Sequence, residues 1–174
     1  MYVLATERLQ LRHLNPGDAA FMLELLNEPS YIRHIGDKGV RTLADAGDFI
    51  QQKIAASYRE NGFGLYLVEL QPAAERLGIC GLVKRDGLQD IDIGFAFLQR
   101  FWSKGYAYEA ASAVMDYARA TVGLTRIVAI AAPDNWSSIA LLEKLGLRFE
   151  KTVLLPGHQS ESKLFSKPFA DAAG

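Results

Sequence analysis

Cysteine is nearly absent from this sequence, and histidine is scarce. The single cysteine, Cys80, has no partner with which to form an intramolecular disulfide. It lies in the apolar run of residues 77–83, which favours a buried structural thiol over a catalytic one. The three histidines His13, His34 and His158 are far apart, and no cysteine spacing typical of a metal site occurs. We therefore expect neither a disulfide scaffold nor a metal centre.

An excess of charge of one sign is also lacking. The 19 lysines and arginines nearly balance the 20 aspartates and glutamates, for a net charge of -1. A general binder of nucleic acid or membrane surfaces would usually show a basic excess. No apolar run approaches the roughly 18 residues of a transmembrane helix, and Glu7 and Arg8 precede any long apolar stretch, unlike a secretory signal. We expect a cytoplasmic protein with neither nucleic acid nor membrane as its partner.

What the sequence does contain is the balance of an ordinary globular protein. Hydrophobic residues make up 49% of the 174 residues and charged residues 22%. A chain of this length can bury a core without disulfides or metal. Because neither an internal repeat nor a linker interrupts it, we expect one domain over residues 1–174.

The first third of the chain predicts a strand followed by two helices. Residues 9–13 alternate between the two faces of a strand. Asn15 and Pro16 are typical of a helix start, where the first caps and the second fits the first helical position. A second helix is expected from Thr42 to Asn61, because Gly62 is typical of a helix end.

The rest of the chain predicts three strands joined by short turns, then helices and strands in alternation. The three strands are expected to be antiparallel, with a hairpin turn at residues 86–87. The expected strands are 64–70, 77–84, 90–98, 126–132, 147–155 and 162–169, and the expected helices are 105–122 and 135–146. The order indicates a mixed α/β domain.

The segment from Phe97 to Ala107 carries the strongest functional signal. A strand runs into a short loop of small residues, and a helix begins at once. The first-turn amides of a helix have no internal partner and lie at the positive end of its dipole, so the loop is a candidate pyrophosphate cradle. An ordinary strand–helix turn is the alternative. The P-loop pattern is absent, and Gly105 alone does not make a dinucleotide fingerprint.

This loop resembles the acyl-CoA loop of the GNAT acetyltransferase superfamily. The superfamily pattern is Gln or Arg, two residues, Gly, one residue, then Gly or Ala. Gly105 and Ala107 match it. Trp102 replaces the Gln or Arg, as it does in the branch of ribosomal-protein N-terminal acetyltransferases, and Ser103 stands where that branch often has glycine.

Three further stretches resemble the same branch, so the resemblance extends from Thr6 to about Phe169. They are the opening strand 6–12, the central strand 92–95, and residues 135–138 followed by 145–147. An aromatic residue is commoner in the branch than Leu147. The resemblance implies the GNAT fold, a largely antiparallel sheet splayed at the cofactor site with helices on both faces.

The resemblance also implies acetyl-CoA as co-substrate and a set of residues that bind it. Amides of the strand end would meet the pantetheine arm, amides of the loop and helix start would meet the pyrophosphate, and an asparagine would bind pantetheine. The alternative for the asparagine is a helix cap. The cofactor-binding residues expected on this basis are Phe97, Leu98, Trp102, Ser103, Lys104, Gly105, Tyr106, Ala107 and Asn135.

Two residues are candidates for catalysis. The resemblance implies that the hydroxyl of Ser138 protonates the departing thiolate, while the alternative is a first-turn serine that bonds backbone amides. Asp92 shares a strand face with Gly94 and Ala96, so it could act as a base or position water in a cleft. It could equally be a solvated residue or pair with a basic neighbour. Glu109, in the first turn of the helix, suits the helix dipole.

The acceptor is expected to be a primary amine. An α-amine has a pKa about 2.5 units below that of lysine, so its deprotonation at neutral pH requires about 3.4 kcal/mol less. Without an obvious strong base, this favours a protein N-terminus, while polyamines, antibiotics and amino acids stay open. We expect an N-acetyltransferase that works by direct transfer in a ternary complex. The alternative is a catalytically silent acyl-CoA-binding regulatory module, and the sequence leaves a homodimer open.

Overall fold

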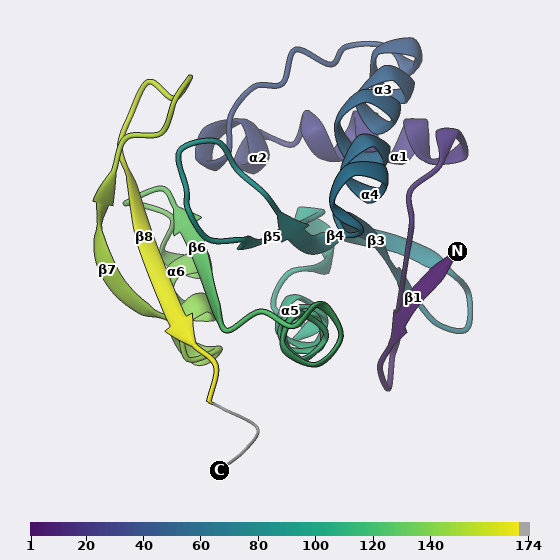
Figure 1. Ribbon diagram of the computed structural model, residues 1–174. Helices are drawn as coiled ribbons and strands as arrows, with labels where there is room; N and C mark the ends of the chain where they lie inside the picture. The colour runs from purple at the N-terminus through teal and green to yellow at the C-terminus, as the bar shows by residue number, and fades with distance from the viewer. Residues whose placement is uncertain (171–174) are drawn as a thin grey trace.

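One mixed sheet of eight strands organises residues 1–170, which are the residues that the computed structural model describes (Figure 1). The spatial order is β1-β2-β3-β4-β5-β6-β8-β7, and every neighbouring pair is antiparallel except β5 and β6. The strands are β1 (Tyr2–Ala5), β2 (Leu9–Arg12), β3 (Leu65–Leu70), β4 (Glu75–Val83), β5 (Asp92–Phe97), β6 (Arg126–Ala131), β7 (Arg148–Val153) and β8 (Ser162–Pro168).

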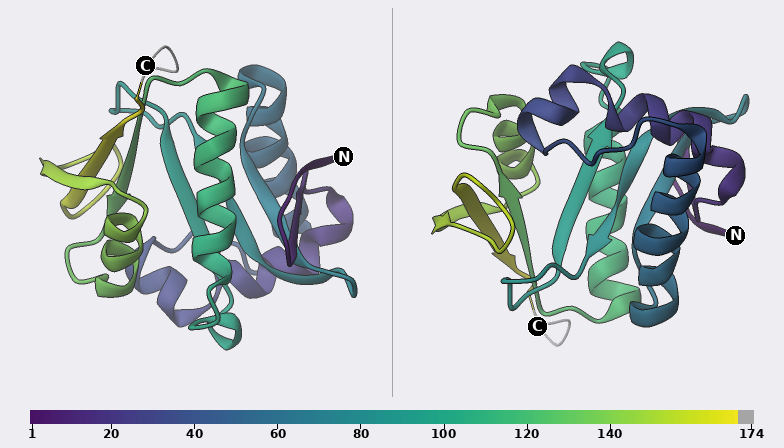
Figure 2. Two further views of the ribbon diagram at one scale, coloured as in Figure 1. Left: turned by 90° about the horizontal axis from the view of Figure 1, so that it is seen from below. Right: turned by 90° about the horizontal axis from the view of Figure 1, so that it is seen from above.

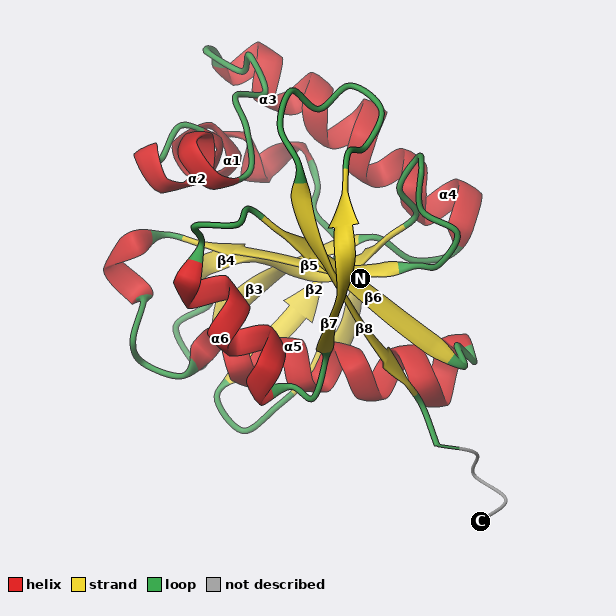
Figure 3. Ribbon diagram, turned by 90° about the vertical axis from the view of Figure 1, so that its left-hand side faces the viewer, coloured by secondary structure: helices red, strands yellow, loops and turns green. Residues whose placement is uncertain are grey.

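Helices cover both faces of this sheet (Figures 2 and 3). On one face lie α1 (Ala19–Leu26), α2 (Pro29–His34), α3 (Leu43–Phe49) and α4 (Ala56–Asn61), and on the other lie α5 (Tyr106–Tyr117) and α6 (Trp136–Lys144). The mixed α/β class and the splayed, largely antiparallel sheet are therefore confirmed. Within residues 1–170, no helix is both long and apolar enough to cross a membrane.

The alternation of side chains along β3 and β4 separates two hydrophobic clusters. Tyr66 and Cys80 point into the cluster beneath α5, whereas Leu67 and Ile79 point into the cluster beneath α1 and α3. All four are buried, because helices cover both faces of these central strands. The expectation of a buried structural Cys80 is confirmed, and burial raises the pKa of its thiol.

Local capping sets the helix boundaries that the sequence predicted. Thr42 accepts a hydrogen bond from the amide of Asp45 at 3.0 Å, and the Asp45 side chain accepts from the Thr42 amide at 3.1 Å, which forms a capping box. The predicted long helix consists of α3, a π-helical stretch (Ile50–Ala55) and α4. It ends at Gly62, whose φ of 78° is readily adopted by glycine.

Two short elements, β1 and α2, were not predicted. Each has six residues or fewer, which is too short for a periodic pattern to develop. The predicted hairpin turn at Asp86–Gly87 is part of a longer loop over residues 84–91, so β5 starts two residues later than expected, at Asp92. That loop and α2 both contribute to the cavities described below.

The sheet opens between β5 and β6. The two parallel strands share a single paired position, Asp92 with Val128, and one further bond from the Val128 amide to the Ile91 carbonyl at 3.1 Å. Beyond that point the strands diverge toward the end of β5 at Phe97. The backbone edge of β5 is thus left open along most of its length, next to the start of α5.

Candidate active site

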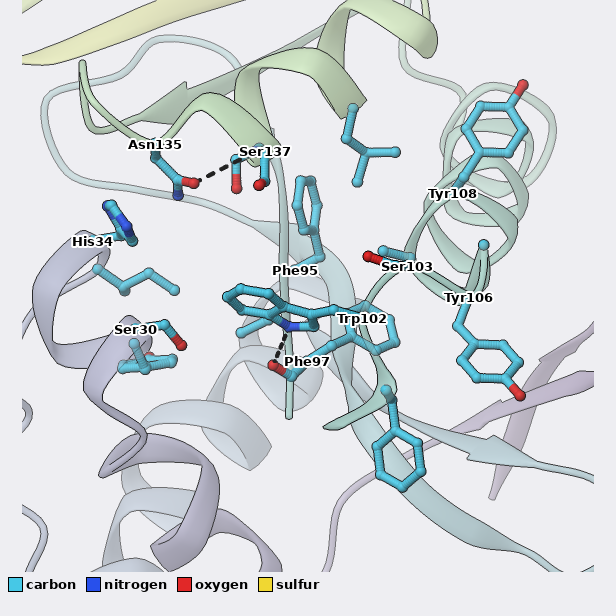
Figure 4. A pocket seen from close by; sticks show the side chains of 18 residues that line it. Ser30, His34, Phe95, Phe97, Trp102, Ser103, Tyr106, Tyr108, Asn135 and Ser137 are labelled. Atoms are coloured by element: carbon cyan, nitrogen blue, oxygen red, sulfur yellow. Dashed lines mark hydrogen bonds between the residues drawn. The ribbon is translucent and has the colours of Figure 1, made fainter. Parts of the chain in front are cut away.

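A cavity of about 280 Å³ lies at the open edge of β5 (Figure 4). The end of β5, the loop before α5 and the starts of α5 and α6 surround it, and α2 closes the side opposite α5. Its lining residues are Ser30, Tyr31, His34, Ile35, Phe95, Ala96, Phe97, Phe101, Trp102, Ser103, Gly105, Tyr106, Ala107, Tyr108, Asn135, Ser137, Ser138 and Leu141. Segments far apart in the sequence therefore converge on one cavity.

Backbone register decides which β5 amides face the gap. The amide of Leu98 donates to the carbonyl of Leu77 at 3.0 Å, on the β4 side. Hydrogen bonds of an antiparallel ladder alternate along the strand, so the backbone groups of Phe95 and Phe97 point to the opposite edge. The predicted Phe97 contact is compatible with this geometry. The Leu98 amide is already bonded within the sheet, and Phe95, which was not predicted, takes its place on the open edge.

The indole of Trp102 fastens the loop to the strand end. Its Nε1 donates to the carbonyl of Phe97 at 2.9 Å, and the residue is 40% exposed where it lines the cavity (Figure 4). This bond joins the loop before α5 to the end of β5. It holds the loop against β5 while the ring forms a wall of the cavity.

The loop turns into α5 through two residues with left-handed backbone. Gly105 precedes the helix with a φ of 80°, and Ser103 has a φ of 63°, which is uncommon for a residue with a side chain. This turn leaves the first-turn amides of α5, from Tyr106 onward, without intrahelical partners at the cavity. Lys104 does not line the cavity, and its carbonyl accepts a bond from Arg8 at 3.1 Å.

An ion pair braces the start of α5 against the β1–β2 turn. Arg8 Nε lies 2.7 Å from Glu109 Oε1, and the Thr6 hydroxyl also donates to Glu109. Burial alone would raise the pKa of Glu109, but the bonds from Thr6 and Arg8 outweigh it and lower the pKa. The guanidinium of Arg8 also lies 4.6 Å from the centre of the Tyr106 ring. Glu109 is thus structural, as its position near the helix dipole suggested.

Asn135 and Ser138 lie together at the start of α6. The Asn135 side-chain oxygen accepts from the Ser138 amide at 3.4 Å, so Asn135 caps the helix (Figure 4). Both residues line the cavity, which means that capping and ligand contact are compatible for Asn135. The half-buried side chain of Ser138 stands at the wall where its hydroxyl can meet a bound group.

Asp92 lies away from this cavity, at the point where β5 and β6 still pair. It is 1% exposed, and its Oδ2 lies 3.0 Å from Nε of Arg85. Its other oxygen, Oδ1, is buried without a protein hydrogen-bond partner. Burial raises the pKa of this carboxyl, and the charge and hydrogen bond of Arg85 oppose the rise. Of the alternatives drawn from the sequence, pairing with a basic neighbour is the one present in the structure.

Helix α2 contributes cavity side chains that no sequence motif marked. His34 lines the cavity, and its Nδ1 lies 3.6 Å from Oδ1 of Asp134. Tyr31 lines the cavity as well, and burial raises its pKa to about 12. The six-residue α2 shows no motif of its own, so only its packing position could reveal these residues.

Comparisons with known proteins agree with this geometry. A family model for the acetyltransferase (GNAT) domain matches residues 8–148. The chain is similar to the uncharacterized protein YkkB of Bacillus subtilis (32% identical, covering 86% of this chain and 87% of the relative). It is also similar to the uncharacterized N-acetyltransferase p20 of Bacillus licheniformis (30% identical, covering 91% and 88%).

Solved structures share the architecture. A GNAT-family acetyltransferase from Bacillus anthracis superposes with a TM-score of 0.79 at 26% identity, covering 97% of this chain and 98% of the other. RimL, a ribosomal L7/L12 α-N-protein acetyltransferase in complex with coenzyme A, superposes with a TM-score of 0.81 at 15% identity, covering 97% and 98%. The second likeness concerns the fold alone.

Proposed function

The chain belongs to the GNAT acetyltransferase family, and from this premise we propose that it transfers the acetyl group of acetyl-CoA to a primary amine by direct attack within a ternary complex. The observation that carries the proposal is the meeting of an open strand edge and an unpaired helix start in one cavity. The amides of a pantetheine arm can bond to the open strand edge, and a pyrophosphate can bond to the unpaired amides of the helix start.

The residues present fit this co-substrate. Phe95 offers its backbone groups and Phe97 its amide to pantetheine, because the Phe97 carbonyl already accepts from Trp102. Asn135 offers its side chain from the facing wall. The amides from Ser103 to Ala107 hold the pyrophosphate, and a Cβ on Gly105 would lie 3.3 Å from Arg8 Nη2 beside them. Among the cofactor residues predicted from the sequence, Leu98 and Lys104 act through the backbone framework, because neither lines the cavity.

The bound co-substrate supplies the acetyl thioester. The neutral amine attacks its carbonyl carbon, a C–N bond forms as the C–S bond breaks, and the amine nitrogen loses a proton to a base. The Ser138 hydroxyl donates a proton to the departing thiolate and is restored from solvent. A backbone amide of the open β5 edge donates to the thioester carbonyl oxygen. This bond stabilises the negative charge that develops on the oxygen during the attack.

Asp92 is the proposed base, but it lies outside the cavity and about 13 Å along β5 from Ala96, so a chain of several waters must link it to the amine. Its buried Oδ1 lacks a protein partner, and such an oxygen is normally satisfied by water or ligand. Burial also raises the pKa of this carboxyl, which makes it a stronger base than an ordinary aspartate. His34 is the rival, since it lines the cavity itself.

The acceptor is proposed to be an α-amine such as a protein N-terminus. The lower pKa of α-amines supports this choice, and the ribosomal-protein α-N-acetyltransferase RimL shares the fold. The rival function is a module that binds acyl-CoA without catalysis. The silent module stays an alternative, because acetyl-CoA binding and catalysis require different parts of the cavity, and the first does not imply the second.

The test is release of free thiol from acetyl-CoA in the presence of peptide N-termini, polyamines and aminoglycosides. We expect acetyl-CoA to raise the melting temperature with or without chelator, and thiol release to require an amine. Binding without release for every amine would establish the silent module. No thermal shift at millimolar acetyl-CoA would overturn both.

A further inference from the structure

A second cavity, of about 620 Å³, gathers basic side chains. It lies between the helical run from α3 to α4, the β4–β5 loop and the β7–β8 hairpin. Its basic lining residues are Lys38, Lys53, Lys84, Arg85 and His158, which come from four separate segments. The whole chain, in contrast, carries a net charge of -1.

The charges of this cavity are only partly compensated. Among the described residues, Arg85 has a carboxylate within ion-pair distance, that of Asp92, whereas Lys38, Lys53 and Lys84 have none. Acidic Glu60 and Asp86 also line the cavity, so its four fully charged basic groups exceed the acidic ones. Lys38, Lys53 and Lys84 are exposed to water, and the local excess of positive charge attracts anions to this cavity.

The basic groups also lie close enough to influence one another. The pKa of Lys38 is lowered by burial and by the charges of Arg85 and Lys53. The pKa of His158 is lowered by burial and by the charges of Arg85 and Lys38. Three loops therefore bring like charges together at one place, which is the arrangement expected of an anion site.

One face of β5 connects this cavity with the first. Ala96 lines the first cavity. A Cβ on Gly94 would lie 3.5 Å from Leu65 and 3.6 Å from Val83, both of which line the second cavity. Asp92, on the same face, pairs with Arg85. From Asp92 to Ala96 the strand spans about 13 Å, so the contact of Arg85 with Asp92 lies at about that distance from the first cavity along β5.

We propose that the second cavity binds a carboxylate or phosphate of the acceptor while the acceptor amine reaches the first cavity. The inference rests on the proposed function and names its substrate class. An extended peptide covers about 13 Å in roughly four residues. The acceptor is therefore a peptide with an anionic side chain at its third or fourth position, and a free amino acid is too short to bridge the two cavities.

The experiment compares kcat/KM for pairs of peptides that differ only in charge. Ala-Ala-Ala-Asp-amide is set against Ala-Ala-Ala-Asn-amide, and a phosphoserine peptide against its serine form, so that carboxylate and phosphate are distinguished. We expect the anionic member to be preferred about 2- to 5-fold at low salt, as for a partly solvated charge contact, and less at high salt. Moving the aspartate to position two is expected to remove the preference.

Variants locate the preference in the cavity. Lys38→Gln is expected to reduce the acidic-to-neutral ratio of kcat/KM toward one, whereas Lys151→Gln, an exposed lysine on β7 outside both cavities, keeps the ratio. Arg85→Lys keeps a positive charge beside buried Asp92, so this variant is expected to fold. The acidic-to-neutral ratio of kcat/KM can then be measured in it as well. Equal rates for neutral and anionic peptides in the wild type would overturn the inference and leave the acetyltransferase intact. Absence of thiol release with every peptide would overturn the proposed function itself.

Discussion

Arg85 Nε lies 3.0 Å from Asp92 Oδ2 at the point where the sheet begins to open. The pair links two regions, because Arg85 lines the basic cavity while Asp92 lies on the strand that leads to the proposed thioester site. The bond satisfies one carboxylate oxygen and leaves Oδ1 without a protein partner. In the proposed function, Asp92 both positions Arg85 for acceptor binding and relays a proton through water.

The first prediction concerns the base. Asp92→Asn keeps the shape and removes the basicity, so the rate is expected to fall about 100-fold or more at neutral pH. It is expected to recover as rising pH deprotonates the free acceptor, near pH 8 for an α-amine and nearer 10 for lysine. The measurement is a pH–rate profile per folded enzyme. His34→Gln is the matched comparison. If the rate of His34→Gln recovers with rising pH while the pH–rate profile of Asp92→Asn overlays that of the wild type, the base is His34.

The second prediction concerns the phosphate loop. In Gly105→Val, a side chain would occupy a left-handed position with a φ of 80° and crowd Arg8. Loss of one charge-assisted bond between an amide and a phosphate is expected to weaken acetyl-CoA binding about 10- to 150-fold. Calorimetry on protein shown to be folded is the measurement. Wild-type affinity in that protein would place the pyrophosphate elsewhere.

The third prediction concerns Ser103, whose φ of 63° is unfavourable for a side chain. Ser103→Gly removes a conformational penalty of about 1 to 2 kcal/mol, and the greater freedom of glycine in the unfolded chain offsets part of the gain. We expect a net stabilisation of about 0.5 to 1 kcal/mol in denaturant unfolding. Lower stability would mean that the hydroxyl contributes a bond that outweighs the strain.

The fourth prediction separates catalysis from capping at the start of α6. Ser138→Ala is expected to lower kcat about 100- to 10,000-fold while the affinity for acetyl-CoA stays close to wild type, because only proton donation is lost. Asn135→Ala is the companion variant, and loss of its cap is expected to lower stability by about 1 kcal/mol. Wild-type turnover in Ser138→Ala, with chemistry shown to be rate-limiting, would leave Ser138 as a helix-start residue.

The fifth prediction concerns acid stability. Asp18 is buried and pairs with Arg12 at 2.8 Å and Arg76 at 2.9 Å. Burial would raise its pKa, but the bonds from Arg12, the Asn15 amide and Arg76 outweigh it and lower the pKa. The lowered pKa means that this stabilisation is present above about pH 4, the ordinary aspartate value, and is lost as pH falls through the folded-state value.

The corresponding variant is Asp18→Asn. It is expected to destabilise the protein by about 1.5 to 3 kcal/mol at pH 7, because charged hydrogen bonds to Asp18 are lost while Arg12 keeps Glu69 as a partner and Arg76 stays partly solvated. Its stability is expected to change less than that of the wild type below pH 4. Asp48→Asn, on an exposed position of α3, is the control and is expected to stay within about 0.5 kcal/mol of wild type. If the free energy of unfolding falls in parallel for the wild type and Asp18→Asn as the pH is lowered, Asp18 is not a source of the acid sensitivity.

The sequence by itself determined what depends on near neighbours along the chain. Thr42 and Asn135 cap helices because a side-chain oxygen lies three residues before a free amide. Gly62 and Gly105 adopt positive φ values at a helix end and a helix start. The alternation along the central strands and the small residues before α5 likewise predicted the sheet and the loop at the cavity.

Only the tertiary structure decided which groups meet. The open amides belong to Phe95 and Phe97 because the register with β4 turns Leu98 toward Leu77, and a one-residue shift would reverse the choice. The pairing of Asp92 with Arg85 depends on how a loop folds back over β5. The basic cavity needs four separate segments to pack together. Each of these follows from contacts between residues distant in the chain, whose free energies no local pattern encodes.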